Sequence, residues 1–163
     1  MRKTKSMNGE MIEYLVDTYS ASIIRLAYSY TSNMQDAEDV VQEVFTKLIQ
    51  KRPDFKDENH IKAWLIRVTI NTSINLVKSI KKKGNVPLEE NIPYYEKEKD
   101  TLVEQLKYIP DKYNAVLYLY YYEGYEVKEI ATILNKRTST IYTLLDRGRD
   151  ILKRHLEKEE WQI

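Results

Sequence analysis

The 163-residue chain has 42% hydrophobic residues, a formal net charge of +1 and no cysteine. The lack of cysteine excludes disulfide scaffolds, thiolate metal sites and cysteine nucleophiles. The basic start leads into no apolar signal core, and no apolar run reaches the roughly 18 residues of a membrane span. We therefore expect a globular protein of the cytoplasm that is not inserted into a membrane.

Charge is unevenly distributed along the chain. Acidic residues dominate from 33 to 46, whereas basic residues are in surplus from 47 to 83 and from 136 to 154. Separate basic and acidic segments favour two partners of opposite character, one of them a nucleic acid. The alternative is that solvated helix faces carry charges in blocks by chance.

The first half of the sequence repeats apolar residues at spacings of three and four, which predicts helices. One helix extends to about Tyr30, and Asn33 is a candidate cap for a second helix that ends before Pro53. A long third helix is predicted from about His60 to Lys82. Three antiparallel helices with short joints form a compact bundle, so residues 10–83 are predicted as the first domain.

Residues 84–100 contain two prolines, five acids and two lysines with little periodicity, which predicts a flexible linker. Beyond it, helices are predicted at 102–109, 111–122, 127–134 and 138–157, and they define a second domain over 101–158. In the tyrosine-rich stretch 118–125 some side chains are expected in its core, and a surface for a protein partner or for the first domain is the alternative for the others. The sequence thus predicts an all-α fold of two small helical domains.

Residues 127–134 and 138–145 flank a short turn with the spacing of a helix-turn-helix. Ala131 is small where the helices would cross, and Asn135 tolerates the left-handed conformation that ends a helix. The second helix would offer hydroxyl groups to phosphates and base edges, with arginines as backbone contacts. The candidate duplex-binding residues are Arg137, Thr138, Ser139, Thr140, Tyr142, Thr143, Arg147 and Arg149. An ordinary hairpin that packs a core is the alternative.

The helix predicted to begin near His60 combines cations, amides and an aromatic ring. Cations follow phosphates, amides bond exposed base edges and a ring stacks on an unpaired base, which suits melted DNA. The candidate residues are Lys62, Trp64, Arg67, Asn71, Asn75 and Lys78. A solvated face is the alternative, and for Trp64 we favour a core position.

Three ordered motifs resemble the extracytoplasmic-function sigma factors. The first is the acidic stretch DAEDVVQEVF at 36–45, and the second is IKAWLIRV at 61–68 with Asn71. The third joins IPDKY at 109–113 to the helix-turn-helix and to LDRGR at 145–149. The resemblance extends from about Glu10 to Leu156.

This resemblance implies a factor that directs transcription initiation without being an enzyme or needing a cofactor. It implies that the β′ clamp helices of core RNA polymerase bind Asp36, Asp39, Gln42 and Glu43, although periodicity alone favours mere solvation of that face. It further implies recognition of the −10 element by the long basic helix, and of the −35 element and the β flap by the last domain. An anti-sigma factor is an implied partner, for which the tyrosines of 118–125 that lie outside the core are the alternative surface.

Two departures from the family pattern concern the helix-turn-helix. Tyr142 and Leu144 stand where family members often have Lys and Arg, which weakens any assignment of base contacts. Glu126 stands where a serine would cap the first helix, so we expect a slightly frayed start.

Two other functions are alternatives to the sigma factor. A stand-alone helix-turn-helix regulator leaves the acidic helix unused and lacks a visible dimerisation element, and an adaptor that binds only protein is a further alternative. His60 and His155 have no ligand spacing with acids, and no glycine-rich phosphate loop is present, so neither an enzyme nor a metal site is predicted.

Overall fold

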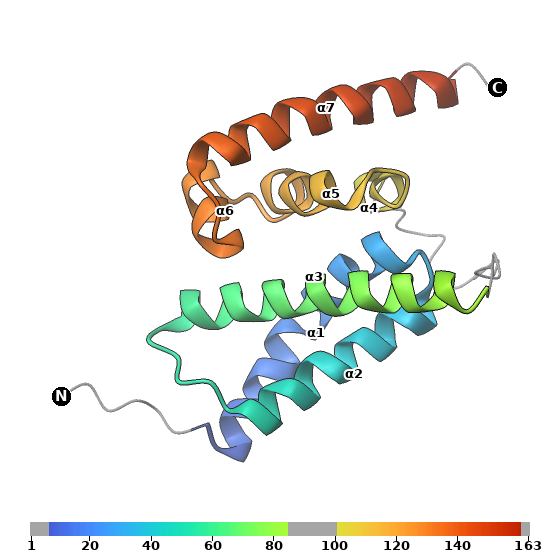
Figure 1. Ribbon diagram of the computed structural model, residues 1–163. Helices are drawn as coiled ribbons and strands as arrows, with labels where there is room; N and C mark the ends of the chain where they lie inside the picture. Colours follow the sequence, from blue (N-terminus) through green and yellow to red (C-terminus); the bar gives the residue numbers. More distant parts are fainter. Residues whose placement is uncertain (1–6, 85–100, 161–163) are drawn as a thin grey trace.

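The computed structural model describes residues 7–84 and 101–160, and in these ranges the chain is all helix and turn, as predicted. Figure 1 shows two groups of helices stacked on each other. The first group is α1 (Gly9–Thr31), α2 (Met34–Lys51) and α3 (Glu58–Lys82). The second is α4 (Thr101–Leu106), α5 (Asp111–Leu117), the π-helix η2 (Tyr118–Tyr122), α6 (Val127–Leu134) and α7 (Thr138–Glu160). We call them the first and the second half.

Side-chain caps set the starts of the three long helices in the first half. Asn8, Asn33 and Asp57 each accept a hydrogen bond from the backbone N–H three residues later, at 2.9, 3.0 and 2.8 Å. Each bond satisfies one of the N–H groups that a helix start leaves unpaired. Asn33 is thus confirmed as a cap, and Asp57 moves the start of α3 two residues ahead of the predicted His60.

The helices α1, α2 and α3 enclose one apolar core. The residues in it that are at most 1% exposed include Leu15, Val40, Val44, Leu48 and Leu65. Val40, Val44 and Leu48 belong to the apolar stripe that predicted α2. The expected three-helix bundle is therefore present. The predicted linker lies, from residue 85 onward, outside the described residues.

The tyrosine-rich helix differs from the prediction. A single α-helix was expected over 111–122, but α5 passes at Tyr118 into a π-helix whose wide turn is closed by the Glu123 N–H donating to the Tyr118 carbonyl at 3.2 Å. Such turns insert one residue into a helix. Tyr118 is buried and stacks on Tyr122 with ring centroids 5.0 Å apart, whereas Tyr121 is exposed. The prediction of a continuous α-helix is wrong at this point.

The helix-turn-helix has the predicted form. Asn135 ends α6 in the left-handed conformation with φ of 54°. Ile130, Ile141 and Leu145 are at most 1% exposed and hold α6 against α7. The expected frayed start of α6 is wrong, because the Glu129 carboxylate accepts a hydrogen bond from the Glu126 backbone N–H at 3.2 Å and forms a capping box.

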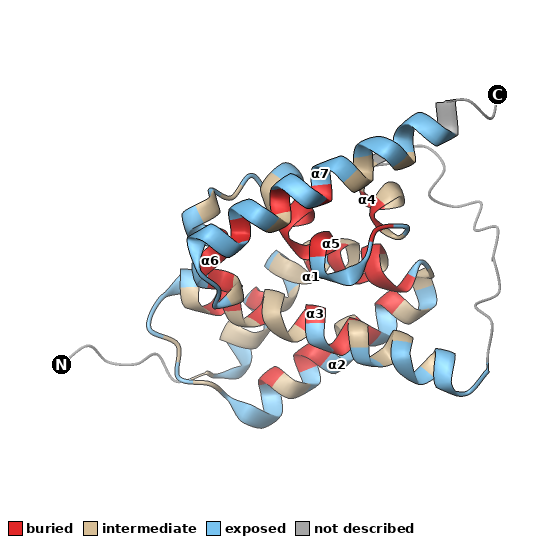
Figure 2. Cartoon of the chain, turned by 45° about the horizontal axis from the view of Figure 1, so that its top comes forward, coloured by how far each residue is buried: buried red, intermediate tan, exposed pale blue. Residues whose placement is uncertain are grey.

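The two halves pack directly on each other. α1 contacts α4 and α5, and α3 contacts α6. One cluster of buried residues combines Leu26, Tyr30 and Ile70 of the first half with members of the second half such as Leu106 and Ile130. Figure 2 shows buried residues on both sides where α5 and α6 face α1 and α3. The described halves therefore share a core.

Candidate nucleic-acid and protein interfaces

Helix α3 presents three faces with different surroundings. Ile61 and Leu65 point into the core of the first half. Ala63, Ile66 and Ile70, at spacings of three and four residues, pack against the second half. The remaining face is polar and turns away from both cores, so a nucleic acid has access to it.

The polar face of α3 brings together most of the residues predicted to bind melted DNA. Trp64, Arg67, Asn71, Asn75 and Lys78 follow each other at spacings of three or four and therefore line one side of the helix. Asn71, Asn75 and Lys78 are exposed, whereas Trp64 and Arg67 are half-buried. The face thus offers two cations and two amides next to one ring edge.

Lys62 and Trp64 differ from the other residues in their positions. Lys62 precedes Asn71 by nine residues, which is two and a half helical turns and places it on the opposite side of α3. Trp64 packs against the core of the first half, in agreement with the core position favoured for it. Its ring lies edge-on to Phe55, with centroids 5.9 Å apart. Lys62 is therefore separate from the polar face.

The loop before α3 is fixed by contacts that the sequence reading missed. Phe55 also packs on the ring of His60, with centroids 5.3 Å apart. The backbone N–H of Lys56 donates to Nδ1 of His60 at 3.1 Å. His60 and Phe55 thereby hold the loop beside the end of α3 at which the polar face begins. The aromatic residues at 55, 60 and 64 were the available signal.

The start of α7 exposes the residues predicted to bind duplex DNA. Thr138, Ser139, Thr140 and Thr143 are exposed, and Tyr142 keeps 56% of its surface accessible. The apolar residues between them point into the core of the second half, so the polar ones share the outer side. Arg137 and Arg147 are exposed as well. Hydroxyl groups, one phenol and two guanidinium groups therefore surround the leading end of this helix.

Arg149 is held by tyrosines of η2. Its Nε donates to the Tyr121 hydroxyl, and its guanidinium lies 5.4 and 5.6 Å from the ring centroids of Tyr120 and Tyr121. Its Nη1 lies 3.5 Å from the Asp146 carboxylate. The hydrogen bond to Tyr121 raises the pKa of Arg149 above its ordinary value. Tyr121 positions this candidate phosphate contact, a role that the sequence reading did not assign.

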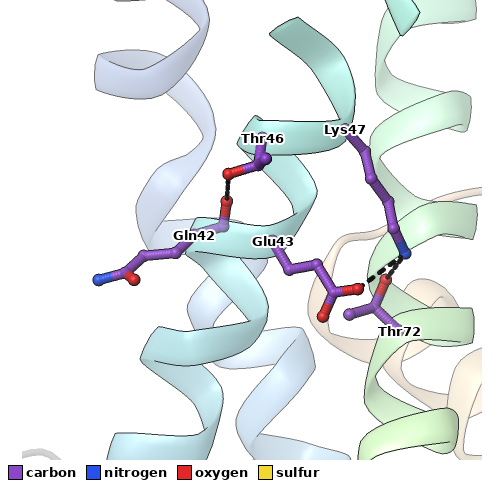
Figure 3. A network of polar contacts seen from close by, with 5 residues as sticks. All are labelled: Gln42, Glu43, Thr46, Lys47 and Thr72. Atoms are coloured by element: carbon purple, nitrogen blue, oxygen red, sulfur yellow. Dashed lines mark hydrogen bonds and ion pairs between the residues drawn. The ribbon is translucent and has the colours of Figure 1, made fainter. Parts of the chain in front are cut away.

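The acidic helix α2 carries its predicted polymerase contacts on its outer side. Asp39, Gln42 and Glu43 are exposed and Asp36 is half-buried. Figure 3 shows the Glu43 carboxylate paired with Lys47 at 3.2 Å. The same ammonium group donates to Oγ1 of Thr72 on α3 at 3.1 Å. The positive charge of Lys47 partly neutralises the negative charge of Glu43. The exposed Asp39 adds negative charge to the outer side of the helix.

Over 7–84 and 101–160, no group of three or more His, Asp or Glu side chains is arranged to hold a metal ion. Among the helices of the same ranges, none is both long enough and apolar enough to cross a membrane.

Comparison with known proteins identifies both halves. The family profile described as Sigma-70 region 2 matches residues 15–83, and the profile described as Sigma-70, region 4 matches residues 99–152. Together these ranges contain α2, α3 and the helix-turn-helix. The order of the two regions agrees with the order of the motifs in the sequence.

Relatives match nearly the whole chain. RNA polymerase sigma factor SigV of Bacillus subtilis is 28% identical over 98% of this chain and 99% of its own length. ECF RNA polymerase sigma factor SigW of the same organism is 26% identical, over 96% of this chain and 94% of its own. These matches support the sigma factor and not the alternative of a stand-alone regulator.

Two solved structures share the fold. The sigma factor RpoE in complex with the anti-sigma factor NepR from Bartonella quintana aligns with a TM-score of 0.70 at 20% identity, over 92% of this chain and 98% of its own. CnrH in complex with the cytosolic domain of CnrY aligns with a TM-score of 0.70 at 19% identity, over 94% and 92%. With both regions matched in order and relatives covering nearly the whole length, the chain belongs to the extracytoplasmic-function sigma factors of the sigma-70 family.

Proposed function

We propose that this chain binds core RNA polymerase, recognises the −10 and −35 elements of a promoter and directs transcription initiation. It acts as an initiation factor in the cytoplasm, and the chemistry of RNA synthesis belongs to the polymerase. In this proposal residues 10–83 serve the −10 element and polymerase, 84–100 form the linker and 101–158 serve the −35 element.

The polar face of α3 is the observation that carries this proposal. Arg67 and Lys78 supply positive charge for phosphates, and Asn71 and Asn75 supply amides that pair with base edges. All four lie on one side of a single helix, beside the loop that Phe55 and His60 fix. Exposed bases of a melted strand, which have lost their pairing partners, are the ligand that such a face suits. Lys62 belongs to the proposal only as a contact from the other side of α3.

The start of α7 supports recognition of the −35 duplex. A helix of a helix-turn-helix enters the major groove with its first residues at base edges. Here those residues are exposed hydroxyl side chains and Tyr142, whose ring suits apolar contact with a thymine methyl group. Arg137, Arg147 and Arg149 would contact the phosphates on either side. Arg149 reaches the DNA with its guanidinium already oriented by Tyr121.

Polymerase binding is assigned to the outer side of α2. Asp36, Asp39, Gln42 and Glu43 offer acids and an amide to a basic partner surface, and complementary charge steers such association. Anti-sigma control is assigned by analogy, because the solved structures named above contain an anti-sigma factor and the cytosolic domain of a partner. An anti-sigma factor is therefore proposed as a regulator of this chain too.

The test combines two substitutions on the polar face. Arg67→Ala with Lys78→Ala should reduce formation of the open complex by about tenfold or more, because two phosphate contacts are lost. Binding to core polymerase should change less than twofold, roughly within the usual scatter of a neutral surface substitution. Permanganate reactivity of the melted thymines measures the first quantity, and a fluorescence titration with core polymerase measures the second.

Lys51→Ala with Lys158→Ala is the matched control, since it removes two exposed positive charges elsewhere. The control should melt the promoter like the unchanged protein. If polymerase affinity and melting fell in step in the Arg67 and Lys78 variant, the assignment of α3 to DNA would be wrong.

A further inference from the structure

The leading end of α7, over residues 138–146, carries no positive charge. It contains neither lysine nor arginine, and the first cations of the helix are Arg147 and Arg149. Guanine presents only acceptors, O6 and N7, in the major groove, and the usual contact to them is a bidentate arginine or lysine. Arg137 precedes the helix, in a turn where its charge suits a phosphate. The part of α7 that enters the groove first therefore has no cationic donor for guanine.

Packing against the rest of the second half fixes which side chains of α7 face outward. Ile141 and Leu145 are at most 1% exposed and lie in the core. Tyr142 and Thr143 are exposed. Residues three and four apart share a side of a helix, so the exposed Asp146 continues the outward side that Tyr142 and Thr143 begin. We call these three side chains the reading face.

Tyr142 brings an apolar ring to the reading face. It keeps 56% of its surface accessible and is the exposed large hydrophobic residue of the helix-turn-helix over 127–146. The one apolar group that a base presents in the major groove is the C5 methyl of thymine. Contact between the ring and this methyl group removes apolar surface of both from water. Tyr142 therefore favours a base pair that contains thymine.

Thr143 adds a methyl group to the reading face and no free donor. Its hydroxyl donates to the Ser139 backbone carbonyl at 3.1 Å, so its hydrogen is used within the helix. What remains for DNA is an oxygen that only accepts and a methyl group. An acceptor cannot bond O6 or N7 of guanine, whereas the methyl group packs on that of thymine. Thr143 therefore favours the same kind of base pair as Tyr142.

Asp146 and Arg149 strengthen the selection against guanine. The Asp146 side chain is 75% exposed, and its ionised carboxylate only accepts hydrogen bonds. Arg149 lies two helical turns beyond Tyr142, or about 10 Å along the axis. Its Nε donates to the Tyr121 hydroxyl and its Nη1 lies 3.5 Å from Asp146, so the guanidinium is held beside η2. Arg149 therefore contacts a phosphate and does not reach the bases that Tyr142 meets.

We propose that this chain reads its −35 element through thymine methyl groups, which Tyr142 and Thr143 contact, and that it selects against guanine at the base pairs these two side chains meet. The inference rests on the proposed function, because it assumes that α7 enters the major groove of the −35 element. It adds the class of element, in which A·T pairs face Tyr142 and Thr143 while Arg137 and Arg147 hold the flanking phosphates.

The experiment identifies the element and then removes single methyl groups from it. Holoenzyme made of this chain and core polymerase selects duplexes from a pool that is randomised over both promoter elements. Each thymine of the selected −35 element is then replaced by deoxyuridine, which lacks only the C5 methyl group. Replacement at the two pairs met by Tyr142 and Thr143 should weaken promoter binding about fourfold each, because one buried methyl group is lost. Replacement elsewhere in the element should change binding by less than about twofold.

Two pairs of variants assign the methyl contacts to side chains. Tyr142→Phe keeps the ring and should keep both losses, whereas Tyr142→Ala should abolish the loss at one pair. Thr143→Val keeps the methyl group and should keep both losses, whereas Thr143→Ser keeps only the hydroxyl and should abolish the loss at the other pair. Tyr14→Ala is the matched control, because it removes a tyrosine of the first half that is 51% exposed. It should leave both losses unchanged, and so should Arg137→Ala, although the latter weakens binding to every sequence.

The outcomes separate this inference from the proposed function. A selected −35 element with G·C pairs at the positions that respond to Tyr142→Ala and Thr143→Ser would overturn the inference and leave the proposed function intact. Deoxyuridine replacements that all change binding by less than about twofold would overturn it in the same way. So would losses that persist in both Tyr142→Ala and Thr143→Ser. If the holoenzyme selected no −35 sequence at all, the proposed role of the second half would fail together with the inference.

Discussion

Gly148 gives a stability prediction whose sign depends on the packing of α5 against α7. A Cβ atom at Gly148 would lie 3.2 Å from Cγ and Cδ1 of Leu117 and 3.3 Å from Cβ of Tyr113. Carbon atoms attract each other best at about 3.5–4.0 Å, so all three contacts are too short. Helix propensity acts in the opposite direction, because alanine is about 1 kcal/mol better than glycine inside a helix.

The crowding should outweigh the propensity. Leu117 is fully buried, and Cβ of Tyr113 is attached to the backbone and cannot rotate away. Overpacking a closed core costs about 1–3 kcal/mol, so Gly148→Ala should lower the free energy of unfolding by about 1 kcal/mol net. Gly148→Val should lower it by about 3 kcal/mol, because branching adds two more carbons to the same space. Urea unfolding followed by circular dichroism measures both variants.

Gly9→Ala is the matched control for this pair. Gly9 is the first residue of α1, and nothing lies within 4 Å of a Cβ built there. This variant should leave the free energy of unfolding unchanged or raise it by up to about 0.5 kcal/mol. A stabilisation of about 1 kcal/mol in Gly148→Ala would refute the reasoning, since it would mean that Leu117 and Tyr113 yield freely.

Four further predictions concern capping, ionisation and the two interfaces. Glu129→Ala should lower the free energy of unfolding by about 1 kcal/mol in urea, because the capping box of α6 is lost. Burial raises the pKa of Tyr118 above its ordinary value of 10, so the folded chain keeps a proton that the unfolded chain releases, and stability should fall as the pH rises above about 10. Tyr118→Phe should reduce this fall, measured by urea unfolding at pH 9 and 11, but not abolish it, because burial raises the pKa of Tyr30 too. Asp39→Arg should weaken core polymerase binding about tenfold in a fluorescence titration and leave the circular dichroism spectrum unchanged. Arg147→Ala should weaken DNA binding across sequences and reduce the slope of log affinity against log salt by about 1.

Each of these has an outcome that contradicts it. An unchanged urea midpoint in Glu129→Ala would show that the Glu129 side chain does not cap α6. A constant free energy of unfolding from pH 9 to 11 would remove the buried tyrosines from the pH response. Unchanged polymerase affinity in Asp39→Arg would take α2 out of the interface. A loss confined to one promoter sequence would make Arg147 a base contact.

The sequence predicted the parts of the fold that depend on local pattern. Helical spacing predicted α1, α2, α3 and the helix-turn-helix, and Asn33 and Asn135 were found because their side chains act within a few residues of the backbone they terminate. The frayed start predicted for α6 was wrong because a side chain three residues further on, Glu129, accepts a hydrogen bond from the Glu126 backbone N–H. The π-turn at Tyr118 leaves no periodic signal in a run of tyrosines.

The contacts between the halves could not be predicted from pattern alone. Ala63, Ile66 and Ile70 of α3 pack into one cluster with Ile130, which lies 60 positions beyond Ile70 in the chain. The Asn114 amide donates to the carbonyls of Ser29 and Leu106, which only the folded chain brings near it. Arg149 was predicted as a DNA contact, but its tyrosine partners lie 28 and 29 residues earlier in the chain, where helical spacing does not reveal them.

The π-helix η2 contributes side chains to two different surfaces of the molecule. Its first residue, Tyr118, reaches α1 through Ser22, while Tyr121 three positions later holds the guanidinium of Arg149. This five-residue turn thus connects the contact between the two halves with one of the candidate phosphate contacts. A substitution of Tyr118 should therefore be followed by a salt titration of DNA binding, because Tyr121, three positions later in the same turn, holds Arg149.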